Sequence, residues 1–252
     1  MTFQPRAGSR PGGDVDLAAV GALVADPGRC RILLALGDGR ALPASRLADE
    51  AGVSAATASS HLGKLTEAGL LTVEARGRHR YHRLAGPEVA DLIEALQRLA
   101  PAAPVRSLRQ GTRAAALREA RTCYDHVAGK LGVALMAALI DKGHLVGGDG
   151  SYDPALSDAR AGFGHEVDYR LSPSGAGFLA ELGVRIPPHR RLMRYCVDWS
   201  EQRHHLAGGL GRGLLDRLLE LDWVRRTEAS RALRVPDGGR DGLRATFGID
   251  LT

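Results

Sequence analysis

The sequence contains few cysteines, few aromatic residues and no long apolar run. The three cysteines among 252 residues, Cys30, Cys123 and Cys196, form no Cys-x-x-Cys pair. Such sparse thiols argue against a secreted disulfide framework and favour a reducing cytoplasm. No run of about 18 apolar residues is present, so we expect no membrane-spanning helix and no membrane partner. Because aromatic residues make up only 4% of the chain, its core must rest on Leu, Val and Ala.

Lysine is also scarce, although the chain is basic. Of 34 Lys and Arg residues only Lys64, Lys130 and Lys142 are lysines, and the formal net charge is +5. A basic balance is compatible with a nucleic-acid partner but does not by itself indicate one. The apolar fraction of 44% and the charged fraction of 25% are typical of a globular protein.

Apolar residues recur mostly at helical spacing, which predicts a mainly α fold with short β-hairpins, an α+β protein. A polar, Gly/Pro-rich start predicts a flexible tail at residues 1–13, rather than a signal peptide. We expect a DNA-binding and dimerisation domain at 14–100. A proline-containing linker follows at 101–111, and a C-terminal domain occupies 112–252.

The first domain shows the pattern of a winged helix-turn-helix. Helices are predicted at 14–24, capped by Asp14, and at 27–36, 44–51 and 55–68. Gly52 lies in the tight turn between the last two of these helices. Strands at 70–75 and 79–84 flank a glycine turn and form the wing, and a further helix is expected at 87–99.

Four segments of this domain together resemble the ArsR family of winged-helix repressors. They are residues 25–36 (ADPGRCRILLAL), 52–62 (GVSAATASSHL), 68–71 (AGLL) and 76–81 (RGRHRY). The resemblance implies a homodimer on a palindromic DNA operator, with the first and last helices of the domain pairing the subunits. Both metal sites known in this family are missing, because residues 45–50 (SRLADE) lack a thiol and 88–99 lack His.

The predicted recognition helix and wing supply the candidate DNA contacts. Short hydroxyl side chains allow a helix to approach the major groove closely, and Arg at a hairpin tip suits phosphate or the minor groove. The simpler alternatives are a solvated helix face and an ordinary charged hairpin. The candidate residues are Ser54, Ala55, Ala56, Thr57, Ser59, Ser60, His61, Lys64, Arg76, Arg78 and Arg80.

The C-terminal half contains an internal repeat. The segment HVAGKLG at 126–132 recurs as HLAGGLG at 205–211, and Cys123-x-Asp125 matches Cys196-x-Asp198. We predict two degenerate winged-helix units at about 121–186 and 194–251, each a helix, a hairpin and a short helix, related by a pseudo-twofold axis.

Equivalent polar residues of the two units are expected to converge. We predict that the two cysteines are buried on helices and line an apolar effector cavity. The candidate effector-binding residues are Cys123, Asp125, His126, Cys196, Asp198 and His205. A Zn²⁺ site, a redox-sensitive thiol pair and simple packing are the alternatives. No catalytic residue, cofactor or metal ligand is assigned.

These features predict a sequence-specific, non-enzymatic transcription regulator, a repressor whose operator binding is modulated by a small molecule at the C-terminal domain. A thiol- or metal-responsive regulator using Cys123 and Cys196 is the alternative. A methyltransferase with a winged-helix dimerisation domain is disfavoured, since no glycine-rich nucleotide turn follows a strand. A protein-interaction module that binds no DNA would be distinguished by the lack of salt-dependent operator binding.

Overall fold

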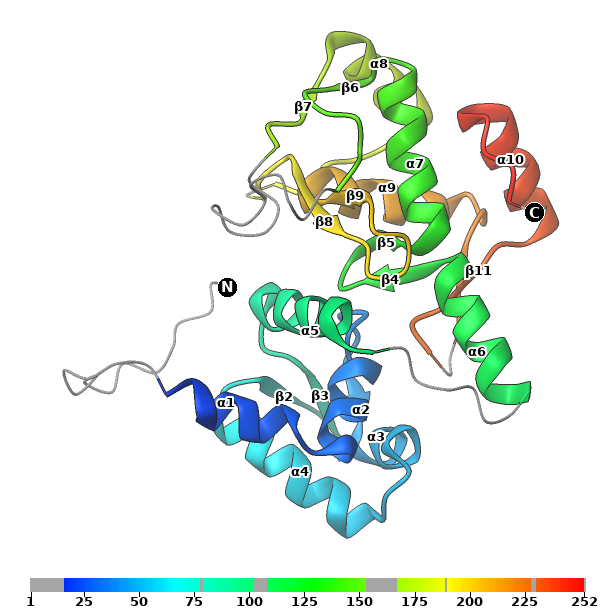
Figure 1. The fold of residues 1–252 in the computed structure, drawn as a ribbon. Helices are drawn as coiled ribbons and strands as arrows, with labels where there is room; N and C mark the ends of the chain where they lie inside the picture. Colours follow the sequence, from blue (N-terminus) through cyan, green and yellow to red (C-terminus); the bar gives the residue numbers. More distant parts are fainter. Residues whose placement is uncertain are drawn as a thin grey trace. The chain divides into compact units, whose positions relative to one another are not determined.

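The computed structural model describes residues 16–77, 79–101, 108–152, 167–188, 190–227 and 230–251 (Figure 1). The chain divides into two compact units, Met1–Ile93 and Glu94–Thr252. The division falls inside α5 (Pro87–Leu99), and α6 (Leu108–Glu119) begins within the stretch expected to be a linker. No helix in the described ranges has the length and apolar character needed to cross a bilayer.

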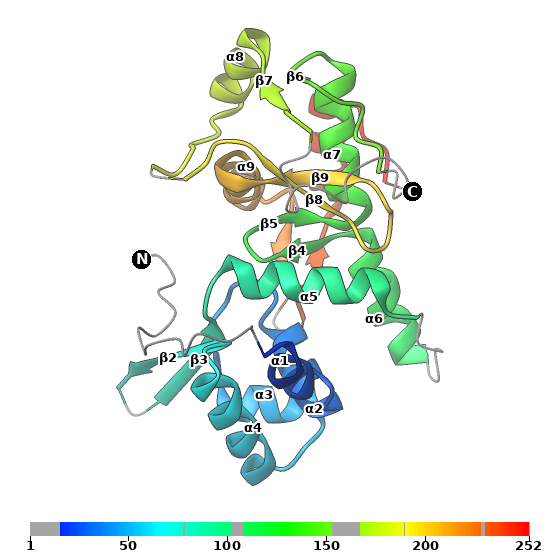
Figure 2. The same ribbon diagram turned by 60° about the vertical axis from the view of Figure 1, so that its left-hand side comes forward.

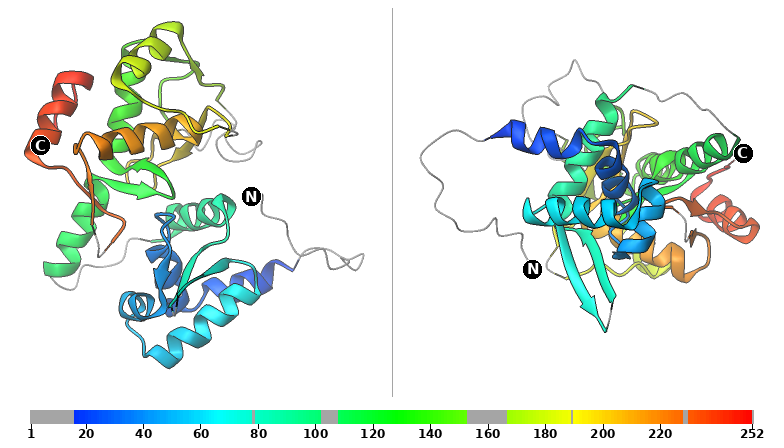
Figure 3. Two further views of the ribbon diagram at one scale, coloured as in Figure 1. Left: turned by 180° about the vertical axis from the view of Figure 1, so that it is seen from behind. Right: turned by 90° about the horizontal axis from the view of Figure 1, so that it is seen from below.

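The first unit is a winged helix-turn-helix, as the sequence predicts. Its helices before α5 are α1 (Leu17–Val24), α2 (Pro27–Ala35), α3 (Ala44–Ala51) and α4 (Ala55–Glu67). Its strands are β1 (Leu42–Pro43), β2 (Leu71–Arg76) and β3 (His79–Leu84), in the sheet order β1-β3-β2. Figure 3 shows the β2–β3 hairpin projecting from the helices of this unit.

Side-chain caps determine where these helices begin. The Asp26 carboxylate accepts a 2.8 Å hydrogen bond from Arg29 N, and Pro27 occupies the first turn of α2. Ser54 caps α4, and Gly52 ends α3 with a φ of 67°. The first helix is capped by Asp16, whereas the sequence suggested Asp14, which lies outside the described residues.

The second unit contains two successive segments with the same order of elements: hairpin, helix, hairpin, helix. The first comprises β4 (Arg121–Cys123), β5 (His126–Ala128), α7 (Gly129–Asp141), β6 (Leu145–Val146), β7 (Arg170–Leu171) and α8 (Pro173–Leu182). The second comprises β8 (Arg194–Val197), β9 (His204–Ala207), α9 (Gly208–Glu220), β10 (Arg225–Arg226), β11 (Leu233–Arg234) and α10 (Asp237–Phe247). Figure 2 shows the first segment together with β8, β9 and α9 of the second. The sequence predicted only a helix, a hairpin and a short helix in each unit. This order was incomplete, because a further hairpin precedes each long helix. The winged-helix character of each segment stays a prediction.

The core of the second unit is aliphatic and forms around α7 and α9. It matches the expectation that Leu, Val and Ala carry the packing, with few aromatic rings added. Its most deeply buried members on these helices are Leu131, Leu135, Met136, Leu139, Leu210, Leu214, Leu215 and Leu218. This core holds the two hairpins β4–β5 and β8–β9, whose strands β5 and β9 are in contact.

Candidate functional site

One face of α4 is exposed and lined with small polar side chains. Ala58, Leu62 and Leu65 are buried on the opposite face, at 0%, 3% and 0% exposure. The exposed residues are Ser54, Ala55, Ala56, Thr57, Ser59, Ser60, Gly63, Lys64 and Glu67. A helix face with such short side chains can approach the edges of DNA bases closely.

The hydroxyl groups on this face differ in what they already contact. Ser54 Oγ accepts a hydrogen bond from Thr57 N at 3.2 Å and lies 2.8 Å from Thr57 Oγ1. Ser54 and Thr57 therefore stabilise the start of the helix as well as facing solvent. Ser59 and Ser60 lie one turn further along, away from the cap.

His61 is the candidate DNA contact whose side chain turns inward. Its Nε2 lies 3.5 Å from Asp26 Oδ1, and its side chain is only 13% exposed. Gly28 leaves room for this ring, because a Cβ there would lie 2.9 Å from His61 Nε2. Packing between α4 and α2 accounts for His61, and its contact with DNA stays a prediction.

The wing carries exposed Arg76 and Arg80, while Arg78 lies outside the described residues. Glu74 accepts hydrogen bonds from Arg76 at 3.0 Å and from Arg83 at 2.7 Å. Arg80 and His82 lie two residues apart on β3 and so share a face of the strand, which runs from solvent at Arg80 to the core at His82. His82 is 7% exposed, and burial lowers its pKa.

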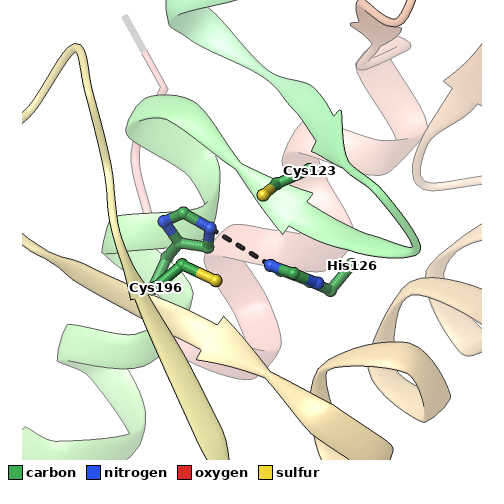
Figure 4. A group of neighbouring side chains, drawn as sticks. Cys123, His126 and Cys196 are labelled. Atoms are coloured by element: carbon green, nitrogen blue, oxygen red, sulfur yellow. Dashed lines mark hydrogen bonds between the residues drawn. The ribbon is translucent and has the colours of Figure 1, made fainter. Parts of the chain in front are cut away.

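In the second unit, two thiols and two imidazoles converge (Figure 4). Cys123 pairs with His126 across the β4–β5 hairpin, and Cys196 pairs with His205 across the β8–β9 hairpin. One ligand atom from each of these side chains lies within 4.8 Å of the others. The two Nε2 atoms are 3.2 Å apart.

A carboxylate lies behind each imidazole. Asp125 Oδ1 is 3.5 Å from His126 Nδ1, and Asp198 Oδ2 is 3.3 Å from His205 Nδ1. Both carboxylates also pair with arginine: Asp125 with Arg190, and Asp198 with Arg121 at 2.9 Å. The candidate effector residues of the two hairpins thus form one continuous polar cluster.

Asp198 is the more deeply buried of the two carboxylates, with a side-chain exposure of 0%. Burial would raise its pKa, but His205, the Arg121 guanidinium and a 2.7 Å hydrogen bond from Gly129 N together hold the pKa well below the usual range. Arg121 is itself fully buried and stacks 4.6 Å above the Trp199 ring. The carboxylate is therefore ionised and available to orient His205.

Two expectations about this cluster were wrong. Cys123 and Cys196 lie on strands rather than helices, and Cys196 is only partly buried. Their sulfur atoms converge with imidazole nitrogens, and the apolar effector cavity that they were expected to line stays a prediction. Sequence reasoning also missed Arg121 and Arg190, although a buried acidic side chain implies a cationic partner. Only the fold shows which arginines fill that role.

Comparison with known proteins agrees with the fold of the first unit. A family model described as a helix-turn-helix domain matches residues 24–74. The HTH-type transcriptional regulator YdfF of Bacillus subtilis is 40% identical over 229 residues, covering 89% of this chain and 94% of that protein. The HTH-type transcriptional regulator CmtR of Mycobacterium tuberculosis is 40% identical over 74 residues, 29% of this chain and 62% of that protein.

Among solved structures, the cadmium metal-sensor CmtR of Mycobacterium tuberculosis is 35% identical and covers 36% of this chain and 94% of its own, with a TM-score of 0.30. A homodimeric winged helix-turn-helix domain from Mycobacterium bovis is 30% identical and covers 35% of this chain and 89% of its own, with a TM-score of 0.31. The match to YdfF extends over nearly the whole chain, both units included. The chain thus belongs to the ArsR-type winged helix-turn-helix transcriptional regulators and carries an additional C-terminal domain.

Proposed function

We propose that this regulator binds a palindromic duplex operator as a homodimer, with α4 in the major groove and the wing against the DNA backbone or minor groove. The observation that carries the proposal is the exposed face of α4, with Ser59, Ser60 and Lys64. Exposed Arg80 on the wing adds a cationic side chain to the same unit. This combination supplies short side chains for base edges and a cation for phosphate.

The first helix supports the homodimer. Within the described part of the chain, α1 has no buried residue, and Leu17 is 77% exposed. The resemblance to the ArsR family implies that the first and last helices of the domain pair the subunits. A dimer would place two α4 helices on half-sites about one helical turn apart, roughly 34–36 Å.

The C-terminal unit is the proposed sensor of the regulator. The protein is proposed to act as a repressor in the cytoplasm, and to do so by binding DNA and effector rather than by catalysis. An effector held by this unit changes operator affinity only if it binds the DNA-competent and incompetent conformations unequally. The Cys-His cluster is the first candidate for the effector site. A surface pocket is the second candidate, for an organic effector, and its lining combines apolar side chains with the charged Asp168, Arg170, Arg191 and Arg194.

Salt dependence of duplex binding tests the DNA interface. Replacing Arg80 by Ala should weaken binding to any duplex and reduce the salt slope by about one unit, because one phosphate contact is lost. Arg225→Ala, an exposed arginine of the second unit, is the matched control and should change neither quantity. Fluorescence anisotropy at about 50 to 200 mM salt measures both. Equal affinities and slopes for Arg80→Ala and the unaltered protein would remove the wing from the proposal.

A further inference from the structure

The Cys-His cluster unites buried polar groups that lie far apart in the sequence. Cys123, His126 and His205 are 2%, 5% and 0% exposed, and they come from two separate hairpins. Thiols and imidazoles withdrawn from water need partners, because a buried polar group without one costs free energy. The two imidazoles therefore need a shared partner, a proton or a metal ion, between their adjacent Nε2 atoms.

The carboxylates determine which ring nitrogen carries the proton. A carboxylate 3.5 Å from His126 Nδ1 and another 3.3 Å from His205 Nδ1 favour the proton on Nδ1 in both rings. A neutral ring with its proton on Nδ1 presents a lone pair at Nε2, and the two Nε2 atoms are 3.2 Å apart, within hydrogen-bond distance. Two lone pairs at this distance repel each other unless they share a proton or a metal ion. Metal-binding histidines commonly show this carboxylate–imidazole arrangement.

The distances agree with a tetrahedral metal centre. Metal–nitrogen bonds of about 2.0–2.1 Å at the tetrahedral angle separate two nitrogen ligands by about 3.3 Å. The observed separation of the two Nε2 atoms is 3.2 Å. With metal–sulfur bonds of about 2.3 Å, two sulfur ligands lie about 3.8 Å apart. All ligand atoms here lie within 4.8 Å of one another, so small side-chain movements complete the geometry.

The chemistry of the ligands selects the class of ion. Two sulfurs and two imidazole nitrogens suit Zn²⁺ and related soft or borderline ions, whereas Mg²⁺ and Ca²⁺ prefer oxygen. Two thiolates balance the charge of a divalent ion. The outer carboxylates are balanced as well, since Asp125 pairs with Arg190 and Asp198 with Arg121. The ion, the two thiolates and the two carboxylate–arginine pairs together carry no net charge, so occupancy of the site buries no unbalanced charge.

We propose that Cys123, His126, Cys196 and His205 bind one Zn²⁺ ion in a tetrahedral site that joins the hairpin β4–β5 to the hairpin β8–β9. All four ligands come from the protein, so the site has no open position for a catalytic water. Cys196 is the only partly exposed ligand, and it gives the ion a route from solvent. Asp125 and Asp198 are positioning residues that act through the imidazoles.

The regulatory consequence rests on the proposed function. If the C-terminal unit is the sensor, its effector is a zinc-class metal ion, and site occupancy sets operator affinity. Coupling free energies in allosteric proteins typically correspond to changes of about 5- to 150-fold in affinity.

Metal analysis of the purified full-length protein tests the site. We expect one zinc per chain, and replacement by Co²⁺ should give thiolate charge-transfer absorption and the intense visible bands of tetrahedral cobalt. Cys196→Ser and His126→Gln should each lose the ion or bind it at least tenfold more weakly. Cys30→Ser and His144→Gln, outside the cluster, should keep one zinc and the same cobalt spectrum. Two results overturn the proposal. One is a metal-free chain that takes up no Co²⁺, and the other is a disulfide between Cys123 and Cys196 that persists in protein freshly purified with a reductant.

Asp125→Asn keeps all four ligands and so remains informative if a ligand variant fails to fold. It should lower zinc affinity about 10- to 100-fold, while the tetrahedral cobalt spectrum is retained. Unaltered affinity would show that Asp125 does not position His126. Loss of the spectrum in folded Asp125→Asn would contradict a site built from the Cys and His side chains alone.

Operator binding with and without zinc separates the two proposals. Duplexes selected by the full-length protein from a random pool serve as the probe, and affinity is compared after chelation and after zinc is restored. A change of at least fivefold supports the metal as effector. Unchanged affinity overturns the effector role while leaving the metal site intact. If neither the chelated nor the zinc-restored protein selects or binds any duplex, the DNA-binding proposal is refuted. The proposed zinc site is not refuted by this result, because the metal analysis tests it separately.

Discussion

At the scale of single residues, two glycines make the Cys-His cluster possible. A Cβ at Gly132 would lie 2.5 Å from Val127 O and 3.5 Å from His205 Cβ. A Cβ at Gly211 would lie 2.6 Å from Leu206 O and 3.1 Å from His126 Cβ. Each glycine of one long helix therefore lies next to the histidine of the other segment. The requirement is for space, because neither glycine has a positive φ.

Replacing Gly132 by Ala should destabilise the protein. The added methyl group meets a backbone carbonyl that cannot move independently of β5, and overpacking of this kind costs about 1–3 kcal/mol. Gly177→Ala in α8 is the matched control, since nothing lies within 4 Å of its added Cβ. It should stabilise by up to about 1 kcal/mol. Denaturant unfolding measures both, and equal effects of the two substitutions would contradict the steric argument.

The sequence identified some single residues well and others poorly. The predicted starts of the helices at residues 27 and 55 are confirmed, and the Asp26 and Ser54 side chains cap them there, because a cap depends on neighbours within three residues. His61 was placed among the DNA contacts, yet its ring lies against Asp26. Its orientation depends on how closely α2 approaches α4, which is a tertiary property.

At the scale of elements, α4 is a helix with two distinct faces. Its apolar stripe is buried in the unit, and its opposite face shows only short or flexible side chains to solvent. The periodicity of the sequence predicts this division, because residues three and four apart share a face. Which exposed residues reach base edges is a property of the complex with DNA.

Ser60→Ala should change sequence preference more than non-specific affinity. Ser60 is exposed on α4 and lies beyond the Ser54–Thr57 cap, so its removal leaves the helix start intact. A lost base contact should reduce discrimination at one operator position by about 1–3 kcal/mol. Selection from a random DNA pool gives the readout, and Ser45→Ala on α3 is the control. An identical motif for Ser60→Ala and the unaltered protein would show that Ser60 does not read bases.

The short hairpins of the second unit were the elements that the sequence did not reveal. β4 and β5 each contain three residues, too few to show the alternation by which a strand is recognised. Gly129 and Gly208 follow these hairpins directly and begin α7 and α9, so the apolar run continues across the boundary. The thiols were therefore assigned to helices.

At the scale of the whole molecule, α1 presents an apolar side chain to solvent. Leu17→Glu should raise the dimer dissociation constant at least tenfold, because a charge would replace an apolar contact at the subunit interface. Leu108→Glu in α6 is the control, since Leu108 is 93% exposed and lies outside the winged-helix unit. Sedimentation equilibrium measures both. A dimer as stable in Leu17→Glu as in the control would place the interface elsewhere.

The sequence by itself determined the winged helix-turn-helix, because its helix caps, glycine turns and apolar periodicity are local signals that agree with one another. It also revealed the repeated Cys, Asp and His positions of the second half. The repeat predicted that these residues converge, but only the tertiary structure decided that a ligand atom from each of Cys123, His126, Cys196 and His205 lies within 4.8 Å of the others. It likewise decided that Arg121 and Arg190 neutralise the carboxylates behind the imidazoles. These contacts join residues of two separate hairpins, and their distances depend on how α7 and α9 pack in the shared core, which no local signal encodes.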